Sequence, residues 1–145
     1  MELESPIEIS IAAQATRFSE PWSPPADLLE LGDGFVAGLV TMFRIDIAVS
    51  LSHMSDLFSN ADFDGVRAEA HMIKGVAAQM GVAVMTCLCV EVEEAARDAS
   101  MSKLEKPLMR LAAAFLRVCD SMEAYSVETR GRQCSLASES GGSLP

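Results

Sequence analysis

The stretch DFDGVRAEAHMIKGVAAQMG, residues 62–81, has the pattern of one amphipathic helix with a signal at each end. Asp62 can cap the helix N-terminus by accepting a hydrogen bond from a backbone amide of the first turn. Gly81 suits the position just after the helix, where a left-handed residue ends it. At about 100° per residue, four large apolar side chains share one side, which we predict to face a core. They are Val66, Ile73, Val76 and Met80.

The opposite side of this helix carries residues of a different kind. On a helical wheel Lys74 lies about 60° to one side of His71 and Gly75 about 40° to the other, with Arg67 and Ala78 also nearby. A histidine buried in the core beside a solvated lysine is one interpretation. Because His71 falls opposite the apolar side, we instead predict that it is exposed.

These side chains together suit phosphoryl chemistry. Imidazole is partly unprotonated near neutral pH, so a ring nitrogen can attack phosphorus. Lys74 supplies a cation one turn away that can meet phosphoryl oxygens, and Gly75 and Ala78 remove bulk beside the ring. Glycine inside a helix costs about 1 kcal/mol relative to alanine, so Gly75 needs a reason. The alternatives are close packing against another helix for Gly75 and a solvated surface lysine for Lys74.

Apolar periodicity predicts three further long helices, over about 33–59, 83–99 and 102–125, after one possible turn at 27–31. Asp33 can cap the first, and Pro107 fits only in the first turn of the last. Four amphipathic helices with short connections predict an all-α fold, an antiparallel four-helix bundle with an extra short N-terminal segment. The residues expected to face the core are Val36, Val40, Phe43, Ile47, Met54, Phe58, Val84, Leu88, Val92, Ala95, Leu104, Leu108, Leu111, Phe115 and Val118.

The chain divides into three parts on this basis. Residues 1–26 form an N-terminal segment, with a short helix within 1–20, and a connector in which three prolines exclude a regular element. The bundle occupies residues 27–125. Residues 126–145 are rich in serine and glycine and poor in apolar residues, and we predict a disordered tail.

The net charge of −10 argues against nucleic acid and anionic membranes as partners, since both require a basic surface. We find no apolar run of the roughly eighteen residues that a membrane span needs and no basic N-terminus of a signal peptide. We therefore expect a cytoplasmic protein.

The four cysteines, Cys87, Cys89, Cys119 and Cys134, have no spacing that predicts a metal site. We expect reduced thiols, with Cys87 and Cys119 packed as small apolar groups. No residue pattern indicates a bound metal, a nucleotide site or a catalytic triad, which argues against an autonomous enzyme.

The stretch HMIKGVAAQMG resembles the signature of histidine phosphotransfer (HPt) domains, with His71, Lys74, Gly75, Ala77 and Gly81 at the matching positions. The resemblance covers about residues 28–124. In the segment TCLCVEVEEAAR, Glu93 occupies a place that the family often fills with Glu or Gln near the histidine. Glu69 departs from the family pattern, because it falls near the core side of the wheel. We expect it either to lie at a tilted boundary of the core or to pair with Arg97 or another base.

The resemblance implies a relay of phosphoryl groups between receiver-domain aspartates, or from a histidine kinase, with the Mg²⁺ supplied by the receiver and no cofactor on this chain. His71 would carry the phosphoryl group on Nε2, Lys74 would stabilise it, and Gly75 would give clearance. Arg67, Ala78 and Gln79 are the expected docking face of a chain that we expect to be monomeric. The alternative is an adaptor that docks receivers and modulates them without transfer.

Overall fold

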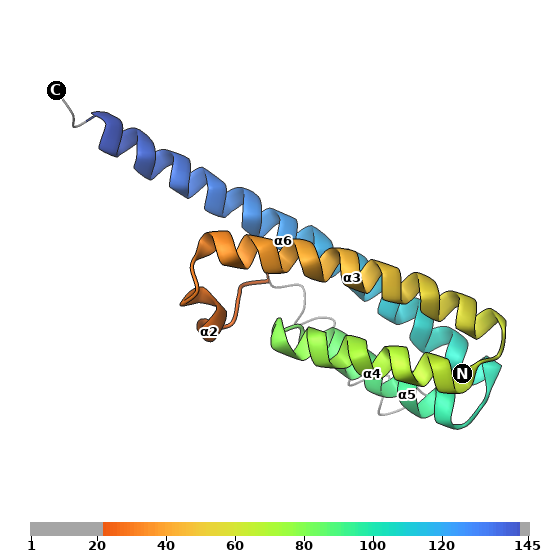
Figure 1. The fold of residues 1–145 in the computed structure, drawn as a ribbon. Helices are drawn as coiled ribbons and strands as arrows, with labels where there is room; N and C mark the ends of the chain where they lie inside the picture. Colours follow the sequence, from red (N-terminus) through yellow and green to blue (C-terminus); the bar gives the residue numbers. More distant parts are fainter. Residues whose placement is uncertain (1–21, 143–145) are drawn as a thin grey trace, which may run out of the picture.

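The computed structural model describes residues 22–142, with side chains as far as residue 132. All regular structure in this range is helical, as predicted (Figure 1). The helices are α2 (Ala26–Leu29), α3 (Asp33–Ser59), α4 (Phe63–Gln79), α5 (Ala83–Arg97) and α6 (Met101–Gly142).

The four long helices form the predicted antiparallel bundle. Residues 60–62, 80–82 and 98–100 connect them, and such short connections reverse the chain at each step. Helix α4 packs against α3 and α5, and α6 packs against the same two helices, so α4 and α6 lie diagonally across the bundle. The site on α4 is therefore flanked by α3 and α5.

The apolar periodicity identified the core correctly. Of the positions expected to face inward, Phe58, Val76 and Leu108 are only partly buried and pack against the core, while all the others are buried. On α4 the buried positions are Val66, Ala70, Ile73 and Ala77. Small residues at 70 and 77 let α4 approach its neighbours closely, and α4 packs most extensively on α5.

Both ends of α4 follow the prediction. The Asp62 side chain caps the helix by accepting a hydrogen bond from the Gly65 amide at 3.0 Å. Gly81 has φ of 71°, and a Cβ at this position would lie 2.9 Å from Pro25 Cγ. The conformation and the close contact together require glycine there.

At the start of α3 the predicted cap is wrong by one residue. Gly32 is the N-cap, with φ of 93°, and Asp33 is the first helical residue. Glycine adopts this backbone conformation readily. Asp33 then contributes a negative charge to the first turn, where the helix dipole favours it.

Helix α6 differs from the prediction at both ends. It begins at Met101, so Pro107 lies inside the helix rather than in its first turn. It continues to Gly142, so residues 126–142 are helical rather than a disordered tail, and its last turns project beyond the other helices (Figure 1). Thr129 is buried, which shows that α6 still has a packed side beyond residue 125. No proline interrupts residues 126–142, and of the three glycines in this range only Gly131 lies away from the helix end, where a glycine costs about 1 kcal/mol.

The proline-rich connector is packed against the bundle. Trp22 is 5% exposed, its Nε1–H donates to the Met80 carbonyl at 2.9 Å, and its backbone N–H donates to Ser121 Oγ at 2.5 Å. Its ring meets that of Tyr125 edge-on, with centroids 5.5 Å apart. Sequence reasoning had placed Trp22 outside the bundle, and the structure makes it part of the core. The predicted helix within 1–20 lies outside the described residues.

Helix α3 corrects one expectation about membranes. It is long and apolar enough to cross a bilayer by length and composition, with a mean hydropathy of 1.7, whereas the sequence analysis found no such run. A core helix passes the same test, and one side of α3 lines the core of the bundle. The remaining apolar side chains include four that are more than half exposed: Phe35, Met42, Ile45 and Val49.

Candidate functional site

His71 projects from α4 into solvent, as the wheel predicted. Its side chain is 75% exposed, and Nδ1 lies 3.4 Å from Oε1 of Glu93 on α5. A carboxylate beside Nδ1 favours the tautomer with the proton on that nitrogen. Nε2 then carries the lone pair, so the ring presents a nucleophile.

Lys74 of α4 and Glu93 of α5 form an ion pair that links the two helices. Lys74 Nζ donates a hydrogen bond to Oε2 at 3.1 Å and lies 3.1 Å from Oε1. The Glu93 side chain is 14% exposed and that of Lys74 is 27% exposed. Oε1 is within ion-pair distance of both His71 and Lys74 but has no well-angled hydrogen bond to either. The structure thus brings His71, Lys74 and Glu93 together.

Gly75 borders the same site, and its missing side chain is unrelated to packing within this chain. A Cβ built at Gly75 meets no atom within 4 Å. This excludes close packing against another helix of the bundle as the reason for glycine. The open space beside His71 is available to an incoming group.

The residues predicted as the docking face are all exposed. Arg67, Ala78 and Gln79 lie on the solvent side of α4, before and after His71. Their role in docking remains a prediction.

Sequence reasoning missed apolar residues next to this face. His53 of α3 is paired with Glu69 of α4, which sets the register of the two antiparallel helices. One turn from this pair, in the direction of the α4 C-terminus, Val49 of α3 comes beside the turn that holds Met72. Val49 is 65% exposed and Met72 is 49% exposed. Pairing the two helical wheels at this register would have revealed the patch.

The His53–Glu69 pair also resolves the unusual position of Glu69. His53 Nδ1 and Glu69 Oε1 are 2.9 Å apart, and the Glu69 side chain is 19% exposed. Glu69 therefore lies at the boundary between α3 and α4. Its partner is His53 rather than Arg97.

Cys89, rather than Cys87 or Cys119, is the fully buried thiol of the described residues. It lies one turn before Glu93 on α5. Burial, and after it the negative charge of Glu93, raises the pKa of Cys89 to about 12, while Lys74 acts in the opposite direction. Cys87 and Cys119 are partly buried, and all three are reduced. The Cys89 thiol is therefore neutral near pH 7 and lies close to the Lys74–Glu93 pair in sequence and charge environment, one turn before Glu93.

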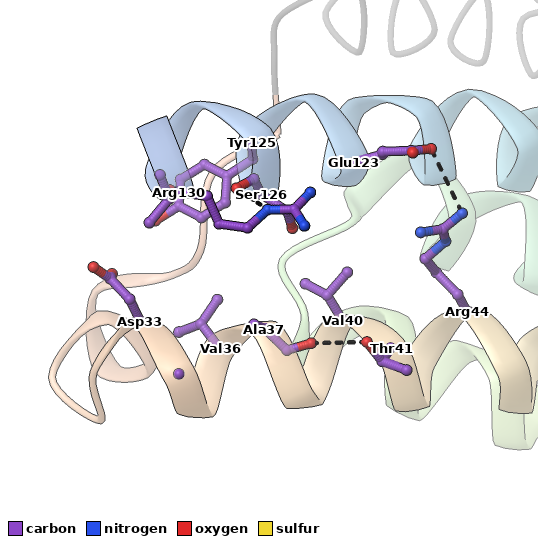
Figure 2. Close-up of a pocket in the computed structure, with 12 residues that line it drawn as sticks. Asp33, Val36, Ala37, Val40, Thr41, Arg44, Glu123, Tyr125, Ser126 and Arg130 are labelled. Atoms are coloured by element: carbon purple, nitrogen blue, oxygen red, sulfur yellow. Dashed lines mark hydrogen bonds and ion pairs between the residues drawn. The ribbon is translucent and has the colours of Figure 1, made fainter. Parts of the chain in front are cut away.

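A separate groove lies between α3 and α6, away from His71 (Figure 2). Its volume is about 330 Å³. Its polar groups are engaged within the chain: Arg44 pairs with Glu123 at 3.8 Å, and Arg130 Nε donates to the Ser126 carbonyl at 3.3 Å. The residues that line this groove include no histidine, unlike the site on α4.

Comparison with known proteins identifies the family of this chain. The family model described as the Hpt domain matches residues 38–129, well over half of the chain. The chain therefore belongs to the histidine phosphotransfer domain family. Members of this family are phosphocarriers of two-component phosphorelays, which exchange phosphoryl groups with histidine kinases and receiver domains.

Two solved structures share the fold. A rice protein assigned as a histidine-containing phosphotransfer protein superposes with a TM-score of 0.72 at 20% identity, covering 88% of this chain and 96% of that chain. The histidine-containing phosphotransfer protein ZmHP2 from maize gives a TM-score of 0.68 at 19% identity, covering 87% of this chain and 98% of that chain. No curated protein sequence matches the chain.

Proposed function

We propose that this protein carries a phosphoryl group on His71 Nε2 and relays it between receiver-domain aspartates, or from a histidine kinase to a receiver. The single observation that supports this most directly is the exposed His71 ring, whose Nδ1 lies 3.4 Å from the Glu93 carboxylate. That contact favours a proton on Nδ1 and an unprotonated Nε2 facing solvent.

The transfer follows from this tautomer. The Nε2 lone pair attacks the phosphorus of the receiver's aspartyl phosphate and forms an N–P bond. The P–O bond breaks, and its electron pair leaves with the aspartate carboxylate. Nδ1 keeps its proton, and Glu93 stabilises the positive charge that the ring gains. The reverse sequence returns the phosphoryl group to a receiver.

The partner completes the chemistry. We propose that the receiver supplies Mg²⁺, which would neutralise the phosphoryl oxygens as they move between the two proteins. This chain would contribute the nucleophile, the Lys74 cation and the space beside Gly75. The net charge of −10 suits a cytoplasmic carrier, and fractionation of the native host would test that location.

The test is a transfer assay with labelled phospho-receivers and Mg²⁺, comparing wild type with His71→Ala. We expect label on the wild type that is labile in acid and stable in alkali, and no label on the variant. His53→Ala is the matched control, because His53 is also exposed and also has a carboxylate at Nδ1.

The adaptor function predicts a different outcome in the same assay. Receivers would bind the wild type, yet none would label it. A label that persists in His71→Ala but disappears in His53→Ala would assign the carrier role to His53 on α3 and overturn the proposal.

A further inference from the structure

The Lys74 cation is already engaged in the unphosphorylated protein. Both oxygens of Glu93 lie 3.1 Å from Lys74 Nζ, and both side chains are mostly shielded from solvent. A cation that is to stabilise a phosphoryl group on His71 must therefore share or exchange its partner.

A phosphoryl group brings up to about two negative charges to the ring, at physiological pH. Lys74 is one turn from His71 on α4, so it is within reach of an anion attached to the ring. One ammonium group then faces two anionic partners. The thiol of Cys89, one turn before Glu93 on α5, is neutral and does not change this balance of charge.

We propose that Glu93 and the phosphoryl group compete for Lys74, so that Glu93 limits how tightly the phosphorylated state is held. Glu93 is thus a positioning residue that keeps phospho-His71 an effective donor. The inference rests on the proposed function of His71. It adds no bond-making step, since the N–P and P–O bonds change as described above.

The structure favours competition between Glu93 and the phosphoryl group for Lys74 over an arrangement in which Glu93 helps Lys74 to hold the phosphoryl group. The partly buried carboxylate loses a favourable charge when Lys74 turns toward the phosphoryl group, and a shielded charge without its partner is costly. An amide at position 93 would carry no such cost. It would still place an oxygen near Nδ1 of His71, so it separates the charge of Glu93 from the position of its side-chain oxygen.

The test is a double-mutant cycle on the exchange equilibrium between this protein and a phosphorylated receiver. The four proteins are wild type, Glu93→Gln, Lys74→Met and the double variant. We expect Glu93→Gln to raise the equilibrium constant for formation of phospho-His71. The factor by which it rises should be roughly five times larger in the wild-type background than in the Lys74→Met background. Direct repulsion between Glu93 and the phosphoryl group acts in both backgrounds and cancels from the comparison.

Two further measurements separate positioning from a structural role. The ¹⁵N resonance of Lys74 Nζ should move on phosphorylation in the wild type, while the His71 ring keeps its Nδ1–H tautomer in Glu93→Gln. Glu69→Gln is the matched control, because Glu69 lies on α4 like His71 and Lys74 but pairs with His53. It should leave the equilibrium at the wild-type value.

The outcomes distinguish the two proposals. If no receiver labels the wild type, the proposed function fails and this inference fails with it. If the wild type is labelled but Glu93→Gln has the same effect with and without Lys74, or has none, only the competition between Glu93 and the phosphoryl group is overturned.

Discussion

At the scale of single residues, Gly75 separates stability from function. A Cβ at this position meets nothing within 4 Å among the residues that the structure describes, so Gly75→Ala should raise the free energy of unfolding by up to about 1 kcal/mol through helix propensity alone. Gly75→Leu should fold equally well but slow phosphoryl transfer at least about ten-fold, by filling the space beside His71. Urea denaturation and the transfer rate measure the two effects. A Gly75→Leu protein with wild-type transfer would contradict the clearance role.

Cys89 gives a second prediction at this scale. Because the thiolate is the reactive form and burial raises the pKa of Cys89 to about 12, this thiol should resist alkylation at pH 8 in the folded protein. It should react in urea, as peptide mass mapping would show. Alkylation of Cys89 in the folded protein at the rate seen in urea would show that burial does not protect this thiol.

The same shift predicts how stability depends on pH. In the unfolded chain Cys89 ionises near its ordinary value of 9.0, whereas in the folded protein it keeps its proton to about 12. The folded state therefore binds more protons in this window. The contribution of Cys89 to stability is complete below pH 9 and is lost as the pH rises toward 12.

The sequence predicted much of the site at this scale. His71, Lys74 and Gly75 could be identified because their spacing on one helix and a family resemblance both pointed to them, whereas Glu93, on α5, was identified by the resemblance alone. The Lys74–Glu93 pair could not be predicted, because it depends on how α5 is rotated against α4. The partner of Glu69 was missed for the same reason, since His53 is on α3.

At the scale of helices, we propose that the docking face extends to the surface of α3 beside α4, which a single helical wheel could not reveal. Val49→Asp should weaken receiver binding by about ten-fold or more, because it puts a charge into an apolar patch that binding would desolvate. Isothermal calorimetry with a receiver would measure it.

The control for this prediction is Leu116→Asp. Leu116 is 64% exposed, similar to Val49 at 65%, but it lies on α6, diagonally opposite α4. It should bind receivers as the wild type does. Equal losses from both changes would indicate a general effect on the fold rather than a docking surface.

Helix positions were predicted well and helix ends less well. Buried periodicity identified all four long helices, because alternating burial along an amphipathic helix is a strong signal. The end of α6 was misjudged, because composition alone suggested disorder while the buried Thr129 extends the packing surface. Pro107 is the seventh residue of α6, where a proline forgoes one helical hydrogen bond, so the expectation that confined it to the first turn was too strict.

At the scale of the whole molecule, the connector before α2 is part of the folded unit. Trp22→Ala should lower the free energy of unfolding by about 3–5 kcal/mol, since it removes a large buried ring. Trp22→Phe should cost less, because it keeps an aromatic contact with Tyr125 and loses the bond to the Met80 carbonyl. Denaturation followed by circular dichroism measures both. Wild-type stability of Trp22→Ala would show that the connector is not anchored.

The position of His71 on an open surface has a consequence for how the proposed carrier would select its partners in a signalling network. As the proposed phosphoryl carrier, His71 would have little means of choosing among phosphorylated partners by itself, because its side chain is 75% exposed and lies outside the groove between α3 and α6. Selectivity must then reside in the surface around it, so a few exchanges at residues such as Val49 and Met72 could redirect the signal to another receiver while the fold and the reacting ring stay the same.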